Sequence, residues 1–165
     1  MIAELDPIYI RTRPGKAIVR LVSHFFFQGR FLTTKHRWLN PFLLAGMNLI
    51  AKLPQLKHVN KPIYIIGMGR SGSTIMGKVL SMHRDVGFLN EARVIWYTVD
   101  PRDDLNGNFY NGPAQYRFSA SDSTPNSRKK IQRIYGFYQA LTGSRRIVDK
   151  TPEVVYRVPY VREFF

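Results

Sequence analysis

The sequence contains no cysteine, which excludes a disulfide, a thiolate metal site and a cysteine nucleophile. Histidine is scarce as well, with four residues in a chain of 165, and no two of them have the spacing of metal ligands. We interpret each histidine as a surface or packing residue. The sequence therefore predicts no metal site.

Acidic residues are also few. The chain has 11 Asp and Glu against 25 Lys and Arg, which gives a formal net charge of +14. Such an excess attracts polyanions, and nucleic acid, an anionic donor, an acidic acceptor or a membrane surface would each satisfy it. No nucleic-acid-binding motif accompanies the charge, so nucleic acid is not expected as a partner.

The sequence lacks a hydrophobic run long enough to cross a membrane. The longest apolar stretch, residues 17–27, is interrupted by Arg20 and is shorter than the ~20 residues of a membrane span. The first fifteen residues contain Glu4 and Asp6 and have no apolar core, unlike a secretory signal. These features predict a cytoplasmic protein, and they leave peripheral contact with a membrane open.

The length and the 44% hydrophobic content suit one domain with a packed core. Residues 1–61 mix apolar and basic residues with helical periodicity, which predicts a helical N-terminal extension. Such a segment can lie on an anionic membrane surface. It can also pack on the rest of the domain, which is the alternative we favour.

Residues 62–165 alternate strand and helix patterns, which predicts an α/β fold with a parallel sheet. Strands are expected at 63–67, 86–89 and 146–149, and helices at 72–83, 92–98, 127–142 and 152–164. In the first of these helices the apolar face consists of Ile75, Val79 and Met82. In the third, Ser127 is the expected N-terminal cap. Residues 100–126 are rich in Asn, Gly, Asp, Ser and Pro and are expected to form a flexible loop.

The most informative stretch is 62–78, where an apolar run leads through a glycine loop into a segment compatible with a helix. A strand followed by such a loop and a helix N-terminus makes an anion site. Backbone N–H groups point into the loop, and the helix dipole adds positive potential. A phosphate or sulfate group is the natural occupant.

Two nucleotide motifs fit this loop in part. Gly67 and Gly72 have the spacing of the nucleotide P-loop, but Ser73 stands where that motif needs a lysine, which weakens an ATP or GTP interpretation. With Gly69, the two glycines also match the dinucleotide fingerprint G-x-G-x-x-G. Glu91 stands roughly where an acidic residue should follow that fingerprint. An NAD-type dinucleotide-binding oxidoreductase is therefore an alternative.

A third motif is a phosphosulfate-binding loop with the core Arg70-Ser71-Gly72-Ser73-Thr74. The arginine supplies a fixed cationic fork that a dinucleotide loop does not need. This core, with the following Ile75-Met76, resembles the sulfotransferase family, which uses 3′-phosphoadenosine 5′-phosphosulfate (PAPS). The resemblance implies that PAPS is bound by Gly69, Arg70, Ser71, Gly72, Ser73 and Thr74.

Glu91 follows the predicted strand 86–89 and should lie at the same sheet edge as the glycine loop. A carboxylate there can act as a general base towards a hydroxyl group. The Glu-x-Arg pattern resembles tyrosylprotein sulfotransferases and related bacterial sulfotransferases. That resemblance implies that Glu91 is the catalytic base and that Arg93 orients the substrate. The alternative is a glutamate that begins a helix and pairs with Arg93 or Arg70.

A second catalytic candidate lies in Asp149-Lys150-Thr151-Pro152. Thr151 and Pro152 suit the N-cap and the first position of a helix, but capping does not explain Lys150. This string, with the following Arg157-Val-Pro-Tyr, resembles bacterial and animal sulfotransferases. The resemblance implies that Lys150, together with Arg70, contacts the phosphosulfate and stabilises the departing phosphate.

The three motifs together imply a P-loop-like three-layer fold that transfers a sulfuryl group from PAPS to a hydroxyl acceptor without a metal. A small molecule, a glycan, a lipid or a peptide could be the acceptor. A non-catalytic domain that binds an anionic membrane surface is a further hypothesis. By the resemblance, the elements that bind the 3′-phosphate would follow Phe165. We therefore expect an N-terminal part of a sulfotransferase with half a donor site, an uncovered sheet edge and little activity alone.

Overall fold

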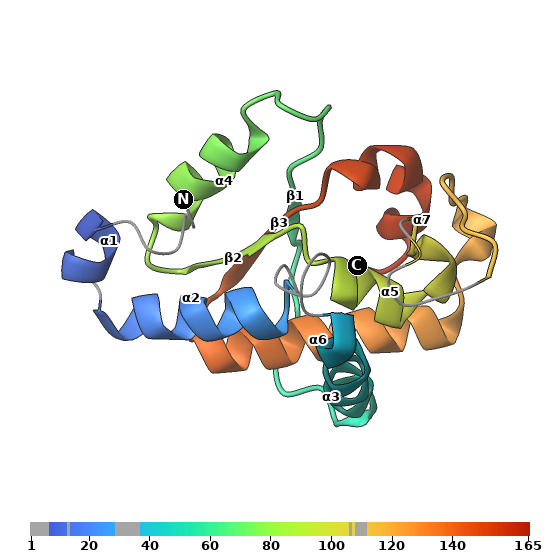
Figure 1. Cartoon of the computed structure of the whole chain (residues 1–165), viewed down its shortest axis with the longest axis horizontal. Coiled ribbons are helices and arrows are strands. Elements are labelled where there is room, and N and C mark those ends of the chain that lie inside the picture. Colours follow the sequence, from blue (N-terminus) through green and yellow to red (C-terminus); the bar gives the residue numbers. More distant parts are fainter. Residues whose placement is uncertain (1–6, 13, 29–36, 106, 108–111) are drawn as a thin grey trace.

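The computed structural model describes residues 7–12, 14–28, 37–105, 107 and 112–165. At its centre, these residues form a parallel sheet of three strands in the order β1-β3-β2 (Figure 1). The strands are β1 (Ile63–Tyr64), β2 (Val86–Asn90) and β3 (Arg146–Lys150). β3 is the last strand in the sequence but lies in the middle, so Tyr64 and Leu89 flank Asp149 on either side.

Helices cover both faces of this sheet (Figure 1). On one face α4 (Ser73–Ser81) connects β1 to β2, and on the other α5 (Arg93–Val99) and α6 (Pro125–Thr142) connect β2 to β3. The chain passes from β1 beyond β3 to β2 and then returns. Right-handed connections that run in opposite directions place their helices on opposite faces. The expected α/β fold with a parallel sheet is confirmed.

The N-terminal extension is helical. Its helices are α1 (Pro7–Thr12), α2 (Pro14–Phe26), the short 3₁₀ helix η3 (Arg37–Leu39) and α3 (Asn40–Lys52). α2 and α3 both pack against α6. A Cβ atom at Gly46 of α3 would lie 3.0 Å from the ring of Phe26, so glycine allows α2 to end against α3. None of the helices in the described ranges is long and apolar enough to span a membrane.

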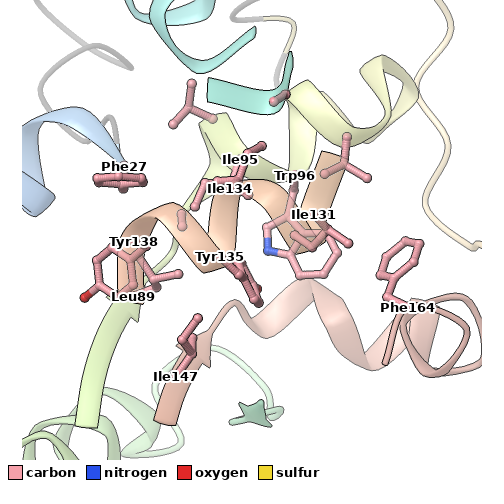
Figure 2. Packing of buried hydrophobic residues seen from close by; sticks show 14 of the residues in the cluster. Phe27, Leu89, Ile95, Trp96, Ile131, Ile134, Tyr135, Tyr138, Ile147 and Phe164 are labelled. Atoms are coloured by element: carbon pink, nitrogen blue, oxygen red, sulfur yellow. The ribbon is translucent and has the colours of Figure 1, made fainter. Parts of the chain in front are cut away.

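The hydrophobic core fills the space between the sheet and α6 (Figure 2). α6 contributes the buried side chains of Ile131, Ile134, Tyr135 and Tyr138, as its helical period predicts. They meet side chains from the strands, from α5, from the residue after α2 and from the C-terminal end, namely Leu89, Ile147, Ile95, Trp96, Phe27 and Phe164. Leu141, at the end of the same stripe, is exposed.

Helix α6 begins earlier than predicted. Its N-cap is Thr124, whose hydroxyl accepts from the N–H of Ser127 at 3.0 Å, while the Ser127 hydroxyl accepts from the N–H of Thr124 at 2.9 Å. The prediction that Ser127 is the cap is wrong, because Pro125 takes the first helical position and moves the cap back. Gly143, with φ of 64°, ends the helix in the left-handed region.

The predicted helix 152–164 is also wrong in part. Residues Pro152–Arg157 form a 3₁₀ helix, η6, and the α-helix α7 covers only Val158–Arg162. Pro159 explains the change, because it has no N–H to donate and its ring clashes with the carbonyl four residues earlier. A continuous α-helix from Pro152 is therefore not available.

The apolar face of α4 points away from the sheet. Ile75 is 68% exposed and Val79 is 63% exposed, whereas the buried residues of α4 are Gly77 and Ser81. A Cβ atom at Gly77 would lie 2.3 Å from the ring of Phe88. Since only small residues permit this close approach of α4 to β2, the small face packs inward and the predicted apolar face is left in contact with solution.

The described parts of segment 100–126 are attached to the core. They include two short 3₁₀ helices, η4 (Pro101–Asp103) and η5 (Ala120–Asp122). Arg157 of η6 is buried and forms an ion pair with Asp103. The guanidinium groups of Arg102 and Arg157 each lie 5.2 Å from the centre of the buried Phe118 ring. The predicted flexibility of this segment is not tested for 106 and 108–111, which lie outside the described residues.

Gly136 provides a test of this packing. A Cβ atom there would lie 2.5 Å from the backbone carbonyl oxygen of Lys57, which has no freedom to rotate away. We expect Gly136→Ala to lower the free energy of unfolding by about 1–3 kcal/mol in spite of the better helix propensity of alanine. Gly15→Ala is the matched control, since a Cβ atom there meets nothing within 4 Å. Equal thermal unfolding midpoints for the two variants would contradict the close approach.

Candidate functional site

The loop between β1 and α4 brings the predicted donor-binding residues to the carboxyl end of β1. Gly72 is the N-cap of α4, and its φ of 79° requires the left-handed region that glycine enters without strain. The first N–H groups of a helix have no partner within the helix, so those at the start of α4 are available to an anion. A Cβ atom at Gly69 would meet nothing within 4 Å, so the space beside this residue of the loop is empty.

Arg70 occupies a strained position in this loop. Its φ of 65° places a non-glycine residue in the left-handed region, where the cost is of order 1–2 kcal/mol. The side chain is exposed and makes no hydrogen bond or ion pair with the described residues. An uncommitted guanidinium therefore stands beside the start of α4.

Glu91 and Lys150, predicted from separate motifs, meet at the carboxyl ends of neighbouring strands. The N–H of Glu91 donates to the carbonyl oxygen of Lys150 at 2.7 Å. The Lys150 ammonium donates to the Glu91 carboxylate in an ion pair, with the two side chains 3% and 27% exposed. The backbone of Glu91, like that of Arg70, lies in the left-handed region, with φ of 58°. Glu91 is thus the more exposed member of the pair.

Arg93 lies beside this pair, but its guanidinium turns elsewhere. Its Nη2 donates to Oε1 of Glu153 at 2.9 Å, which joins the start of α5 to η6. Its backbone N–H donates to the carbonyl oxygen of Glu91 at 2.8 Å. Sequence reasoning did not single out Glu153, and the available signal was its place directly after the Asp-Lys-Thr-Pro string.

Asp149 directly precedes Lys150 in β3 and is completely buried. Its carboxylate accepts from Trp96 Nε1 at 3.1 Å, from the Tyr135 hydroxyl at 2.5 Å and from the Thr151 hydroxyl at 2.7 Å. Burial raises the pKa of Asp149 to about 6, and the three hydrogen bonds hold the pKa below the value that burial alone would produce. Thr151 is the N-cap residue of η6 and Pro152 its first residue, as predicted, but the Thr151 hydroxyl donates to Asp149 and makes no cap hydrogen bond.

A hollow of about 280 Å³ lies beside β1 and away from this pair. Its lining is mainly apolar and includes Tyr64, Ile66, Val154, Val158, Val161 and Phe165. None of the predicted site residues lines it. Within the described ranges, no group of three or more His, Asp or Glu side chains could hold a metal ion.

Comparison with protein families identifies the class of this chain. The family described as the sulfotransferase family matches residues 62–165, which is more than half of the chain. The chain therefore belongs to the sulfotransferase family, whose general activity is sulfuryl transfer. Comparisons with curated proteins and with solved structures found no match.

The Asp149 network predicts a pH dependence of stability. The pKa of Asp149 is about 6 in the folded protein, above the ordinary 3.8. The folded protein therefore binds a proton on this carboxylate more tightly than the unfolded chain does. Asp149 therefore makes the protein more stable as pH falls from about 7 to about 4. Buried Asp103, whose pKa burial also raises to about 6, acts in the same direction.

Asp149→Asn should remove one of these two contributions, so the change of unfolding free energy between pH 4 and 7 becomes shallower. At pH 7 we also expect a loss of about 1–3 kcal/mol, since the amide N–H₂ faces donors. Urea unfolding across this pH range measures both effects, with Asp85→Asn as the surface control. An unchanged pH profile in Asp149→Asn would refute the assignment.

Proposed function

We propose that this chain transfers a sulfuryl group from PAPS to a hydroxyl acceptor, with Glu91 as the general base. The observation that carries the proposal is the contact between Glu91 and Lys150 at the carboxyl edge of the sheet, where the glycine loop also begins. Membership of the sulfotransferase family favours this proposal over a dinucleotide-binding oxidoreductase.

The glycine loop would hold the phosphosulfate of the donor. Arg70 offers a guanidinium that no described residue engages, and the start of α4 offers backbone N–H groups. The hydroxyl groups of Ser71, Ser73 and Thr74 supply further hydrogen-bond donors. Such an arrangement suits a doubly charged group, because the positive charges are fixed before the ligand arrives.

In the proposed transfer, the acceptor hydroxyl gives its proton to the Glu91 carboxylate while its oxygen attacks sulfur. The bond between sulfur and the bridging oxygen of the 5′-phosphate breaks. The products are the sulfate ester and 3′-phosphoadenosine 5′-phosphate, and the proton remains on Glu91 until it passes to solvent. No metal is needed for this balance of charge.

Lys150 would stabilise the charge that develops on the departing phosphate. Its ammonium has three donors, so it can hold the Glu91 carboxylate and still contact the donor. Because its side chain is almost completely buried, an interaction with phosphate is weakly screened by water. Arg93, held by Glu153, would support the strand end that carries Glu91.

Ligand binding provides the first test of the donor. We expect PAPS and 3′,5′-ADP to raise the thermal unfolding midpoint of the chain, whereas NAD and ATP should not. A ligand at about 100 times its dissociation constant adds about 2.7 kcal/mol of stability, which corresponds to several degrees. Arg70→Ala should abolish the shift, and Arg84→Ala, which removes an exposed arginine outside the loop, should keep it. A shift with NAD alone, or with none of the ligands, would overturn the donor assignment.

Glu91→Gln tests the base. Glutamine can still accept the hydrogen bond from Lys150 but cannot take a proton, so turnover should fall about 10²- to 10⁴-fold. The thermal shift with 3′,5′-ADP should stay within error of the unsubstituted chain. Glu163→Gln is the control, because Glu163 pairs with Arg128 far from the loop in the sequence. A Gln variant with nearly full turnover would remove Glu91 from the role of base.

A further inference from the structure

We infer that the outer face of α3 is a docking surface for an anionic lipid bilayer. This inference is independent of the sulfuryl-transfer proposal. It concerns the opposite side of the sheet from α4 and its loop (Figure 1). We call this surface the α3 outer stripe, and it consists of Phe42, Ala45, Leu49 and Lys52 of α3 together with Trp38 of the preceding helix η3.

The spacing of the stripe follows the helix period. Its members are separated by four and three residues in turn, so they form a single row along the helix. Trp38 is 68% exposed, Phe42 is 72% exposed and Leu49 is 62% exposed. Two aromatic rings and a leucine therefore face solution in line, and the row ends at the exposed Lys52.

The other side of α3 is already occupied. Met47, Ile50 and Ala51 are buried in the core, and α3 packs on α5 and α6. α3 is thus apolar on two opposite sides, whereas an ordinary surface helix has one apolar stripe. Burial in the protein accounts for the inner side only, and the outer stripe has no apolar partner in the described residues.

The charge around the α3 outer stripe indicates which partner would cover it. The helices on this side of the sheet, α2, α3, α5 and α6, contain no Asp or Glu. Between residues 7 and 61, which precede the sheet, the sequence has 10 Lys and Arg and no acidic residue. An apolar row in a region without carboxylates is attracted to anionic headgroups and can bury its side chains among acyl chains.

A second copy of the chain fits this surface less well, because two acid-free faces would bring like charges together. The neighbouring helix α2 repeats the arrangement, with the exposed residues Ile18, Val22 and Phe25 spaced by four and three. Phe26 packs directly on Gly46 of α3, so the two helices adjoin. A bilayer is broad enough to receive side chains from both.

Vesicle flotation of the full chain tests the inference. We expect binding to vesicles of equal parts phosphatidylcholine and phosphatidylglycerol, and weak binding to pure phosphatidylcholine. Raising salt from about 0.1 M to about 1 M shortens the screening length from about 10 Å to about 3 Å, so binding should fall. The double variant Phe42→Ser, Leu49→Ser should reduce the partition coefficient at least about tenfold.

The control is Ile75→Ser, Val79→Ser, which removes two equally exposed apolar residues from α4 on the opposite side of the sheet. It should bind vesicles as the unsubstituted chain does. Equal loss in both double variants, or no binding to anionic vesicles, would overturn the inference. So would a change from dimer to monomer in sedimentation caused by the α3 substitutions alone, since this result would assign the stripe to a second copy. The ligand shifts with PAPS and NAD use a different readout, so the two proposals can fail separately.

Discussion

The buried carboxylate of Asp149 is the interaction on which the rest of the structure depends. It lies in the central strand and accepts hydrogen bonds from Trp96 of α5, Tyr135 of α6 and Thr151 at the start of η6. An acidic group in such a position is stable only when its oxygens are fully engaged, because an unsatisfied buried charge is very costly. These hydrogen bonds fix α5, α6 and the start of η6 around the end of β3. Lys150, which directly follows Asp149, is therefore held in one position.

The same edge of the sheet stores backbone strain. Three described non-glycine residues have positive φ, and two of them are Arg70 and Glu91. Strained residues persist where the surrounding structure determines them, and they occur often at ligand sites. In Glu91 the strain has a visible cause, because the left-handed turn lets its N–H bond to β3 while its carboxylate returns to Lys150. The two strand ends are thereby joined by both backbone and side chain.

Sequence reasoning found what depends on local pattern. It located all three strands and the glycine loop, because apolar runs and glycine spacing report local structure directly, although β1 covers only Ile63–Tyr64 of the expected 63–67. It could not tell which face of α4 packs inward, since that choice depends on the Phe88 ring that meets Gly77. It also found the N-cap position of Thr151, because a threonine before a proline is typical of a helix start, but it did not predict where the threonine hydroxyl donates. The competing acceptor, Asp149, becomes available only when the strand is buried.

The carboxylates form mainly internal ion pairs, and from residue 7 onward all of them lie after residue 84. The positive charge of residues 7–84 is therefore not balanced locally. From residue 85 onward, acidic side chains pair with arginines in Arg102–Asp122, Arg93–Glu153, Arg157–Asp103 and Arg128–Glu163, and with Lys150 through Glu91. Residues 7–84 have no carboxylate to offer their own cations. Their positive charge can be neutralised only by anions from outside or by distant parts of the chain. The carboxyl edge of the sheet carries the ion pair of Glu91 and Lys150, so it offers a bound group both an acceptor and a donor. The helices α2 and α3 offer cations without carboxylates. The proposed sulfuryl transfer and the proposed contact with a bilayer thus belong to different parts of the molecule.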